Sequence, residues 1–163
     1  MDKISKVLHF LDSLAIPYTL YRHRPLPTIE IALEYWRDIP GTHCKNLFFR
    51  NHKGDKHYLV IVECHQELNI HDLEKRLREG KLSFASPERL EANLGLSPGS
   101  VSPFGLINDT EHNVKVFIDI NLLSSDTLSF HPNDNTATII IKIDDFKKFL
   151  KICKNECLFQ ELY

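Results

Sequence analysis

Lys45 and Asn46 begin an apolar, strand-forming run within His43-Cys44-Lys45-Asn46-Leu47-Phe48-Phe49-Arg50. A lysine at this point is either a solvated cation at a strand edge or a cation that faces developing negative charge in a site. Two further segments are candidates to complete such a site. The loop from residue 99 to 105 carries two glycines and two serines, which suits backbone N–H groups that approach a ligand closely. His131 lies at a strand end, where its ring either reaches a pocket or only satisfies the following turn.

Other catalytic and metal-binding arrangements find little support in the sequence. The doublets His43-Cys44 and Cys64-His65 resemble pairs of metal ligands. Adjacent residues on a strand point to opposite faces, so each doublet offers one ligand at most and we expect no metal site. No GxSxG, GxGxxG or GxxxxGK[ST] motif is present, which argues against a serine-hydrolase elbow and against the common nucleotide-binding folds. A cysteine nucleophile needs a base and a lowered pKa, neither of which the sequence shows, so buried thiols at strand ends are expected instead.

Length and composition favour an ordinary globular protein. The chain has 163 residues, 42% of them hydrophobic, and a formal net charge of -2, so we expect a single domain over residues 1–163. The net charge argues against broad, non-specific nucleic-acid binding but allows a local basic patch. No signal peptide or membrane-spanning run is evident, which predicts a soluble, cytoplasmic protein without a membrane partner. The four cysteines show no CxxC spacing, which favours reduced thiols.

Periodicity and turn signals predict helices alternating with short strands. Helices are expected over 4–14, 29–36, 70–77 and 87–94 and after Asp144 as a cap; strands are expected over 18–23, 45–50, 56–63, 114–121, 128–131 and 136–143. Residues 58–62 are apolar at consecutive positions, so their strand should be central in its sheet. The predicted fold class is α/β (α+β), with a mixed, mainly antiparallel sheet surrounded by helices.

Five segments in this order resemble the YbaK/ProX family of aminoacyl-tRNA deacylases, free-standing relatives of the editing domain of bacterial prolyl-tRNA synthetases. They are His43–Phe49, the hairpin onward to Val60, Leu82–Ser86 with Glu88-Arg89-Leu90, Gly99–Gly105, and Phe130–Asn133. The resemblance covers nearly the whole chain and is greatest to the alanine-specific branch, often called ProXp-ala or PrdX-like. It therefore implies the fold of the prolyl-tRNA synthetase editing domain, and a trans-editing hydrolase that removes alanine from mischarged proline tRNA.

The resemblance also implies roles for individual residues. Lys45 would lie close to the 3′-terminal adenosine and the ester, and Asn46 would hold the aminoacyl group or the ribose. His131 would line the same pocket, and the active-site loop would be Gly99, Ser100, Val101, Ser102, Pro103, Phe104 and Gly105. On a regular strand, however, Lys45 and Asn46 point to opposite faces. We therefore expect a bulge or twist where this strand begins.

The expected reaction is hydrolysis of an activated ester without a covalent enzyme intermediate, a metal or another cofactor. A small pocket would accept alanine and refuse the larger proline. The acceptor end of the tRNA is the expected partner, with phosphate contacts from Arg22, Arg24, Arg50, Lys53 and Lys56. A stable complex with prolyl-tRNA synthetase is left open. Two alternatives also stay open, namely deacylation of cysteinyl- or seryl-tRNA, and a non-catalytic module that binds tRNA or a synthetase.

Overall fold

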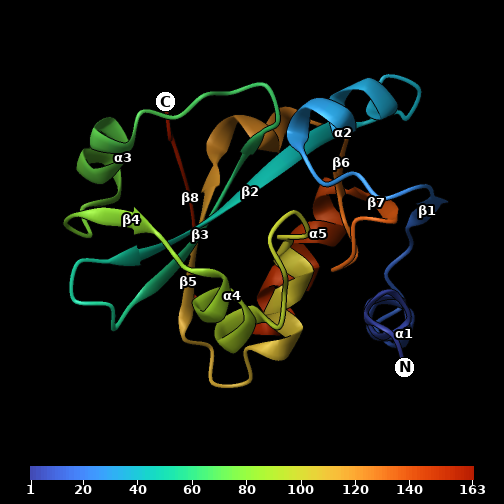
Figure 1. Cartoon of the computed structure of the whole chain (residues 1–163). Coiled ribbons are helices and arrows are strands. Elements are labelled where there is room, and N and C mark those ends of the chain that lie inside the picture. The colour runs from blue at the N-terminus through green and yellow to red at the C-terminus, as the bar shows by residue number, and fades with distance from the viewer.

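The computed structural model describes all residues from Met1 to Tyr163, and its strands form one mixed sheet covered by helices (Figure 1). The strand order is β1-β7-β6-β2-β3-β5-β8, with short β4 paired to β2. Four strand pairings are antiparallel and three are parallel. The strands are β1 (Thr19–Arg22), β2 (Thr42–Asn51), β3 (His57–Glu63), β4 (Leu82–Phe84), β5 (Val114–Asp119), β6 (Thr127–Phe130), β7 (Ala137–Lys142) and β8 (Cys157–Gln160).

Helices cover both faces of the sheet. They are α1 (Lys3–Ser13), α2 (Ile29–Trp36), α3 (Ile70–Leu77), α4 (Pro87–Leu94) and α5 (Ile143–Cys153), with 3₁₀ turns η1 (Pro103–Asn108) and η2 (Ile120–Ser124). The largest apolar cluster packs α1, α4, α5 and η1 against one face. Two smaller clusters lie on the other face, one under α3 and one under α2. Figure 1 shows α2 near the start of β2, and α3 and β4 near its other end.

Strand alternation assigns each residue of β2 to a face. Phe48 belongs to the large cluster, whereas its neighbour Phe49 belongs to the cluster under α3. On β3 all five residues from Tyr58 to Val62 are buried, and this strand lies between β2 and β5. The prediction that this apolar run is central in the sheet is confirmed.

The predicted fold class, a mixed sheet of strands surrounded by helices, is confirmed, and the predicted helices and strands are present with shifts of a few residues. Asp144 is not the cap of the last helix. That helix begins at Ile143 after Lys142 and has no capping side chain, and Asp144 lies in its first turn, where a carboxylate favours the positive end of the helix dipole. The short strands β4 and β8 were not predicted from the sequence.

No helix is long and apolar enough to cross a membrane. All four cysteines are unpaired, and three of them are buried.

Candidate active site

The central strand β2 has a stretch of open edge. Its first residues, Thr42 and His43, pair with β6, and its last, Phe49 to Asn51, pair with β4. Between them the strand is paired only with β3 on its other side. The carbonyl of His43 accepts a hydrogen bond from the N–H of Cys64, on the side of β2 that faces β3. The carbonyl of Phe48 accepts one from the N–H of Ala85, on the opposite side. The backbone groups of successive residues on a strand point to alternate sides, so the N–H and C=O of Asn46 point away from β3, toward the open edge.

A cavity of about 320 Å³ lies along this open edge. Its walls come from the strand itself, the start of α2 and the segment before it, the loop after α4, and the end of β6. The lining residues are Leu26, Pro27, Thr28, Ile29, Ala32, Trp36, Cys44, Lys45, Asn46, Leu47, Gly99, Val101 and His131. The structure therefore brings together Lys45, Asn46, Gly99, Val101 and His131, which are far apart in the sequence.

Lys45 and Asn46 both line this cavity although they point to opposite faces of β2. The register with β3 is continuous through these positions, Lys45 opposite Val62 and Asn46 opposite Ile61, so the strand contains no bulge there. Of the two distortions expected here, a bulge or a twist, the bulge is absent. The two side chains share a cavity because it opens at the strand edge, where both faces of the sheet are reached at once.

The Asn46 side-chain oxygen and the Lys45 ammonium group have no bonding partner within the chain. Asn46 Oδ1 is buried and has no hydrogen-bond partner in the chain. A buried amide oxygen without a partner costs about 1–3 kcal/mol, so a donor from a bound molecule would be favoured at this atom. The Lys45 side chain is half-buried and enters no ion pair of the structure.

The ring of His131 is fixed and presents an unprotonated nitrogen. Its Nδ1 lies 2.8 Å from the carbonyl oxygen of Ala137, which can only accept, so Nδ1 carries the proton. Burial lowers the pKa of His131, and nearby His23 acts in the same direction. The ring is therefore neutral near pH 7, and Nε2 remains as a hydrogen-bond acceptor at the cavity.

Fewer residues of the loop after α4 line the cavity than the sequence predicts. Gly99 and Val101 line the cavity, whereas Ser100 and Ser102 are buried and lie outside the lining. The N–H of Ser100 donates to Ser97, and the N–H groups of Phe104 and Gly105 donate to Ser102. These three amides are therefore already satisfied within the loop. Ser102 is the cap of η1, which is a structural role.

Residues 103–105 belong to the core. Phe104 is fully buried, and its ring contacts Phe130 and Phe149 edge-on. A Cβ on Gly105 would approach Leu96 to 2.7 Å, so the absence of a side chain permits close packing here. Pro103, Phe104 and Gly105 do not line the cavity, which leaves no direct contact for them in the expected substrate-binding role. They position the loop instead.

The loop is tied to the corner after β6 by Asn133. The side-chain Nδ2 of this buried residue donates to the carbonyl of Phe104 at 3.2 Å, and its backbone adopts a φ of 64°. On the other side of the loop, a Cβ at Gly99 would lie 3.1 Å from the carbonyl oxygen of Pro27, and its φ is 85°. Both a positive φ and close approach to the chain therefore favour glycine at this position.

The five basic residues expected to contact phosphates are not gathered in one place. Arg22 and Arg24 are exposed, and they lie in the segment that leads to the cavity wall at Leu26. Lys53 and Lys56 are exposed in the β2–β3 turn, about 20 Å along β2 from Lys45 at 3.3 Å per residue. Arg50 is half-buried and donates to the carbonyls of Asn51 and His52 at 3.2 and 3.3 Å, so it stabilises the turn.

The wall formed by α2 was not predicted as part of the site. Thr28 is the cap of this helix and accepts from the N–H of Ile31 at 3.3 Å. Thr28 and Ile29 place the helix N-terminus, which carries the positive end of the helix dipole, at the cavity wall. Trp36 stacks on His43 with ring centres 4.8 Å apart and donates to Thr138. The sequence predicts the helix over 29–36, but the apolar period of a helix does not indicate which part of the fold the helix covers.

The two cysteine–histidine doublets differ in the structure. Cys44 is buried, which raises the pKa of its thiol well above the usual value, so it is not poised as a nucleophile. Cys64 and His65 lie beyond the end of β3, in a turn. Strand alternation therefore does not separate them, and the reason given for excluding them as joint ligands is wrong.

Comparison with known proteins identifies the family. The sequence profile of the aminoacyl-tRNA editing domain matches residues 23–149. The chain belongs to this family. A curated relative, the prolyl-tRNA editing protein ProX of Acetoanaerobium sticklandii, is 40% identical over 151 residues, which are 93% of this chain and 92% of the relative. The prolyl-tRNA synthetase associated domain-containing protein 1 of Mus musculus is 32% identical over 145 residues, 86% of this chain and 85% of that protein.

Solved structures show the same fold. A crystal structure described as a candidate trans-editing enzyme for prolyl tRNA synthetase superposes with a TM-score of 0.71 at 21% identity, covering 98% of this chain and 96% of that one. The hypothetical protein APE2540 gives a TM-score of 0.73 at 16% identity over 99% of both chains. The family and the relatives together make this chain an aminoacyl-tRNA deacylase, a hydrolase whose substrate is a charged tRNA.

Proposed function

We propose that this deacylase removes alanine from mischarged proline tRNA in trans, in the cavity at the open edge of β2. The observation that carries the proposal is the meeting of Lys45, Asn46 and His131 around one small, partly apolar cavity. The identity to a prolyl-tRNA editing protein supports proline tRNA as the carrier. An aminoacyl ester is already activated, so the protein needs to place a water and stabilise an oxyanion.

The ester would enter with its carbonyl oxygen toward the Lys45 ammonium. This cation, together with the positive end of α2 at Thr28, would stabilise the negative charge that develops on that oxygen. The α-ammonium of the alanyl group is a strong donor, and Asn46 Oδ1 is a buried acceptor without a partner. We assign these two groups to each other.

His131 would receive the proton of the attacking water. Nε2 is unprotonated because Nδ1 is held as a donor by Ala137. Water adds to the carbonyl carbon as its proton passes to Nε2, and the tetrahedral oxyanion then collapses. Its collapse breaks the bond to the ribose oxygen, which takes the proton from Nε2 and leaves as the hydroxyl. Free alanine and uncharged tRNA result, and the protein forms no covalent bond.

Selectivity would come from the apolar end of the cavity. Leu26, Ala32 and Trp36 wall it, and Ala32 and Trp36 are held in the buried cluster under α2. A methyl side chain would fit against this wall. The larger proline ring would be excluded, because the packed wall residues could move aside for it only with strain.

A panel of charged proline tRNAs tests the proposal. Alanyl-, seryl-, cysteinyl- and prolyl-tRNA would be incubated with the purified protein, and release of the amino acid would be measured under single-turnover conditions. We expect alanyl-tRNA to be hydrolysed fastest and prolyl-tRNA to stay intact. Faster hydrolysis of the seryl or cysteinyl ester would reassign the substrate, and no hydrolysis of any ester would favour a binding module.

A further inference from the structure

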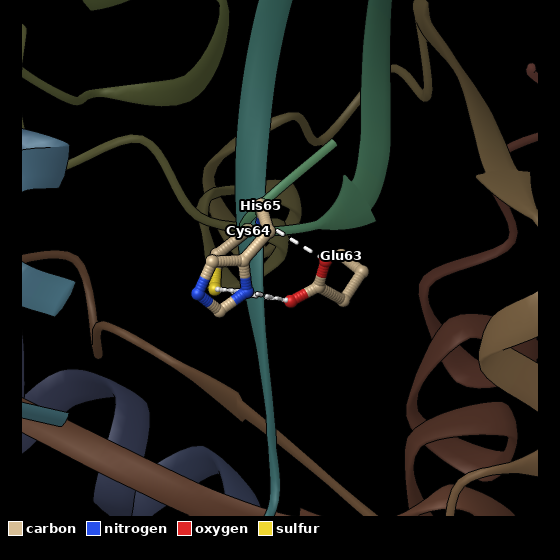
Figure 2. Close-up of side chains that lie close together, drawn as sticks. All are labelled: Glu63, Cys64 and His65. Carbon is tan, nitrogen blue, oxygen red and sulfur yellow. Dashed lines mark hydrogen bonds and ion pairs between the residues drawn. The ribbon is translucent and has the colours of Figure 1, made fainter. Parts of the chain in front are cut away.

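Three potential metal ligands converge in the turn after β3. Glu63 ends the strand, and Cys64 and His65 follow it. The turn is held by hydrogen bonds from the Cys64 N–H to His43 and from the Gln66 N–H to Glu63. Figure 2 shows the carboxylate, thiol and imidazole of these three consecutive residues directed toward one another. One ligand atom from each lies within 4.8 Å of the other two.

The contacts do not form a catalytic relay. Cys64 Sγ lies 3.5 Å from His65 Nδ1, and Glu63 Oε1 lies 2.5 Å from the same nitrogen. A thiol–imidazole–carboxylate relay needs the two partners on different ring nitrogens, since the proton enters at one and the other is oriented. Convergence of three atoms on one point is instead the arrangement that a bound cation requires.

We propose that Glu63, Cys64 and His65 bind one zinc-class divalent cation through Oε1, Sγ and Nδ1, with water as the fourth ligand. In tetrahedral zinc sites with bonds of about 2.0–2.3 Å, ligand atoms are roughly 3.3–3.8 Å apart. The Sγ–Oε1 and Sγ–Nδ1 distances are 3.3 and 3.5 Å. Only the Oε1–Nδ1 pair must open, which the exposed His65 side chain permits, since 70% of its surface is accessible.

The chemistry of binding is an exchange of a proton for the cation. The thiol of Cys64 loses its proton to solvent as the Sγ bond to the cation forms, and His65 binds as the neutral tautomer that carries its proton on Nε2, which leaves the Nδ1 lone pair for the cation. A thiolate, an imidazole and a carboxylate together favour zinc over the hard cations magnesium and calcium, which take oxygen ligands.

The site lies behind one wall of the active-site cavity. Cys64 packs in the apolar cluster with Ala32 and Trp36 of α2, and both of these residues line the cavity. A cation bound at Cys64 would fasten the end of β3 where α2 rests on it. We assign it a structural role, which does not depend on the substrate proposed above.

Cobalt titration tests the site directly. Co²⁺ would be added to the metal-free protein and absorption recorded, because a cobalt–thiolate bond gives a near-ultraviolet charge-transfer band and a tetrahedral site gives visible bands. We expect one equivalent of Co²⁺ to bind with both signals, and Zn²⁺ to displace it. Absence of these signals in the folded wild-type protein would overturn the proposal.

Matched variants locate the ligands. Cys64→Ser should abolish the charge-transfer band, whereas Cys157→Ser, at the least buried cysteine, should keep it. His65→Ala should weaken binding by at least about 10-fold, because even the loss of a residue that only hydrogen-bonds to a metal ligand typically has an effect of that size. His71→Ala, at an exposed histidine beside Glu74 on α3, should leave binding unchanged. Because His65 is exposed, its variant tests the site even if Cys64→Ser fails to fold. A band retained in Cys64→Ser or equal affinity in His65→Ala would contradict the assignment.

Discussion

Lys45 and Asn46 are consecutive residues on opposite faces of β2, and both line one cavity. This is possible because β2 pairs with β6 at its start and with β4 at its end, and has no partner on that side between them. The cavity is a gap in the sheet at a strand edge, so it receives a cation from one face and an amide from the other.

Replacement of Lys45 by alanine should slow deacylation of alanyl-tRNA by about 100-fold, because a single preorganised oxyanion contact is typically worth that much. The single-turnover rate at saturating protein measures this effect. Lys53→Ala is the matched control, since Lys53 is exposed in the distant β2–β3 turn, and its rate should be unchanged. Near-normal turnover by the Lys45 variant would remove this residue from the chemistry.

Asn46→Ala should lower activity by about 10- to 100-fold, the cost of one hydrogen bond to a charged group. Its stability toward urea should hardly change, because Asn46 Oδ1 has no internal partner to lose. Asn133→Ala gives the contrast. It loses the bond from Nδ2 to Phe104 and places alanine at a φ of 64°, so its unfolding midpoint should fall. Asn46→Ala with full activity but reduced stability would show a structural amide instead.

Ala32→Val should shrink the apolar end of the cavity, where Ala32 is 2% exposed. Two added methyl groups in a packed wall strain it by about 1–3 kcal/mol, and they would occupy the space assigned to the substrate methyl. We expect hydrolysis of alanyl-tRNA to fall more than hydrolysis of glycyl-tRNA, which has no side chain. An equal loss for both esters would indicate general damage to the fold, and a thermal melt of the variant serves as the control.

His131 should make stability depend on pH. Burial lowers its pKa in the folded protein, whereas the unfolded chain titrates near the ordinary value of about 6.5. The unfolded state therefore binds the proton first, so the stabilising effect is complete above about pH 6.5 and is lost as the pH falls through that value toward the lowered folded pKa. His23 and Asp134 are the charged or titratable groups that act on the ring.

Urea unfolding between pH 5 and 8 measures this dependence. The His131→Gln variant should lose part of the decline below about pH 6.5, whereas His9→Gln, at an exposed position of α1, should keep it. The same His131 variant tests proton transfer. Wild-type rates in a folded His131→Gln protein would assign the proton to a substrate hydroxyl instead.

Arg24 should contribute more to tRNA binding than Lys53. Arg24 is exposed two residues before the cavity wall at Leu26, whereas Lys53 is at the far end of the hairpin. Arg24→Ala should weaken binding to an acceptor-stem RNA and reduce the slope of log K against log salt by about 1. Binding isotherms at several salt concentrations measure both effects. Equal slopes for wild type and both variants would exclude this phosphate contact.

The sequence alone determined the helices and longer strands, because their apolar period is local: residues 3.6 or 2 positions apart share a face whatever the rest of the chain does. It also identified Lys45, Asn46, Gly99, Val101 and His131 as candidates, and all of them line the cavity. The family resemblance was readable for the same reason, since it depends on residue types in order along the chain.

The tertiary structure decided what depends on partners distant in sequence. Only strand pairing shows that β2 has an open edge, so only the fold explains how two opposed side chains share one cavity. Burial of Phe104 depends on α5, which begins about 40 residues later, and the cavity wall at Trp36 depends on how α2 lies across the sheet. Cys64 and His65 come together because they lie in a turn, where the side chains of neighbouring residues no longer point to opposite faces as they do on a strand. Sequence patterns do not fix the residue at which a strand ends.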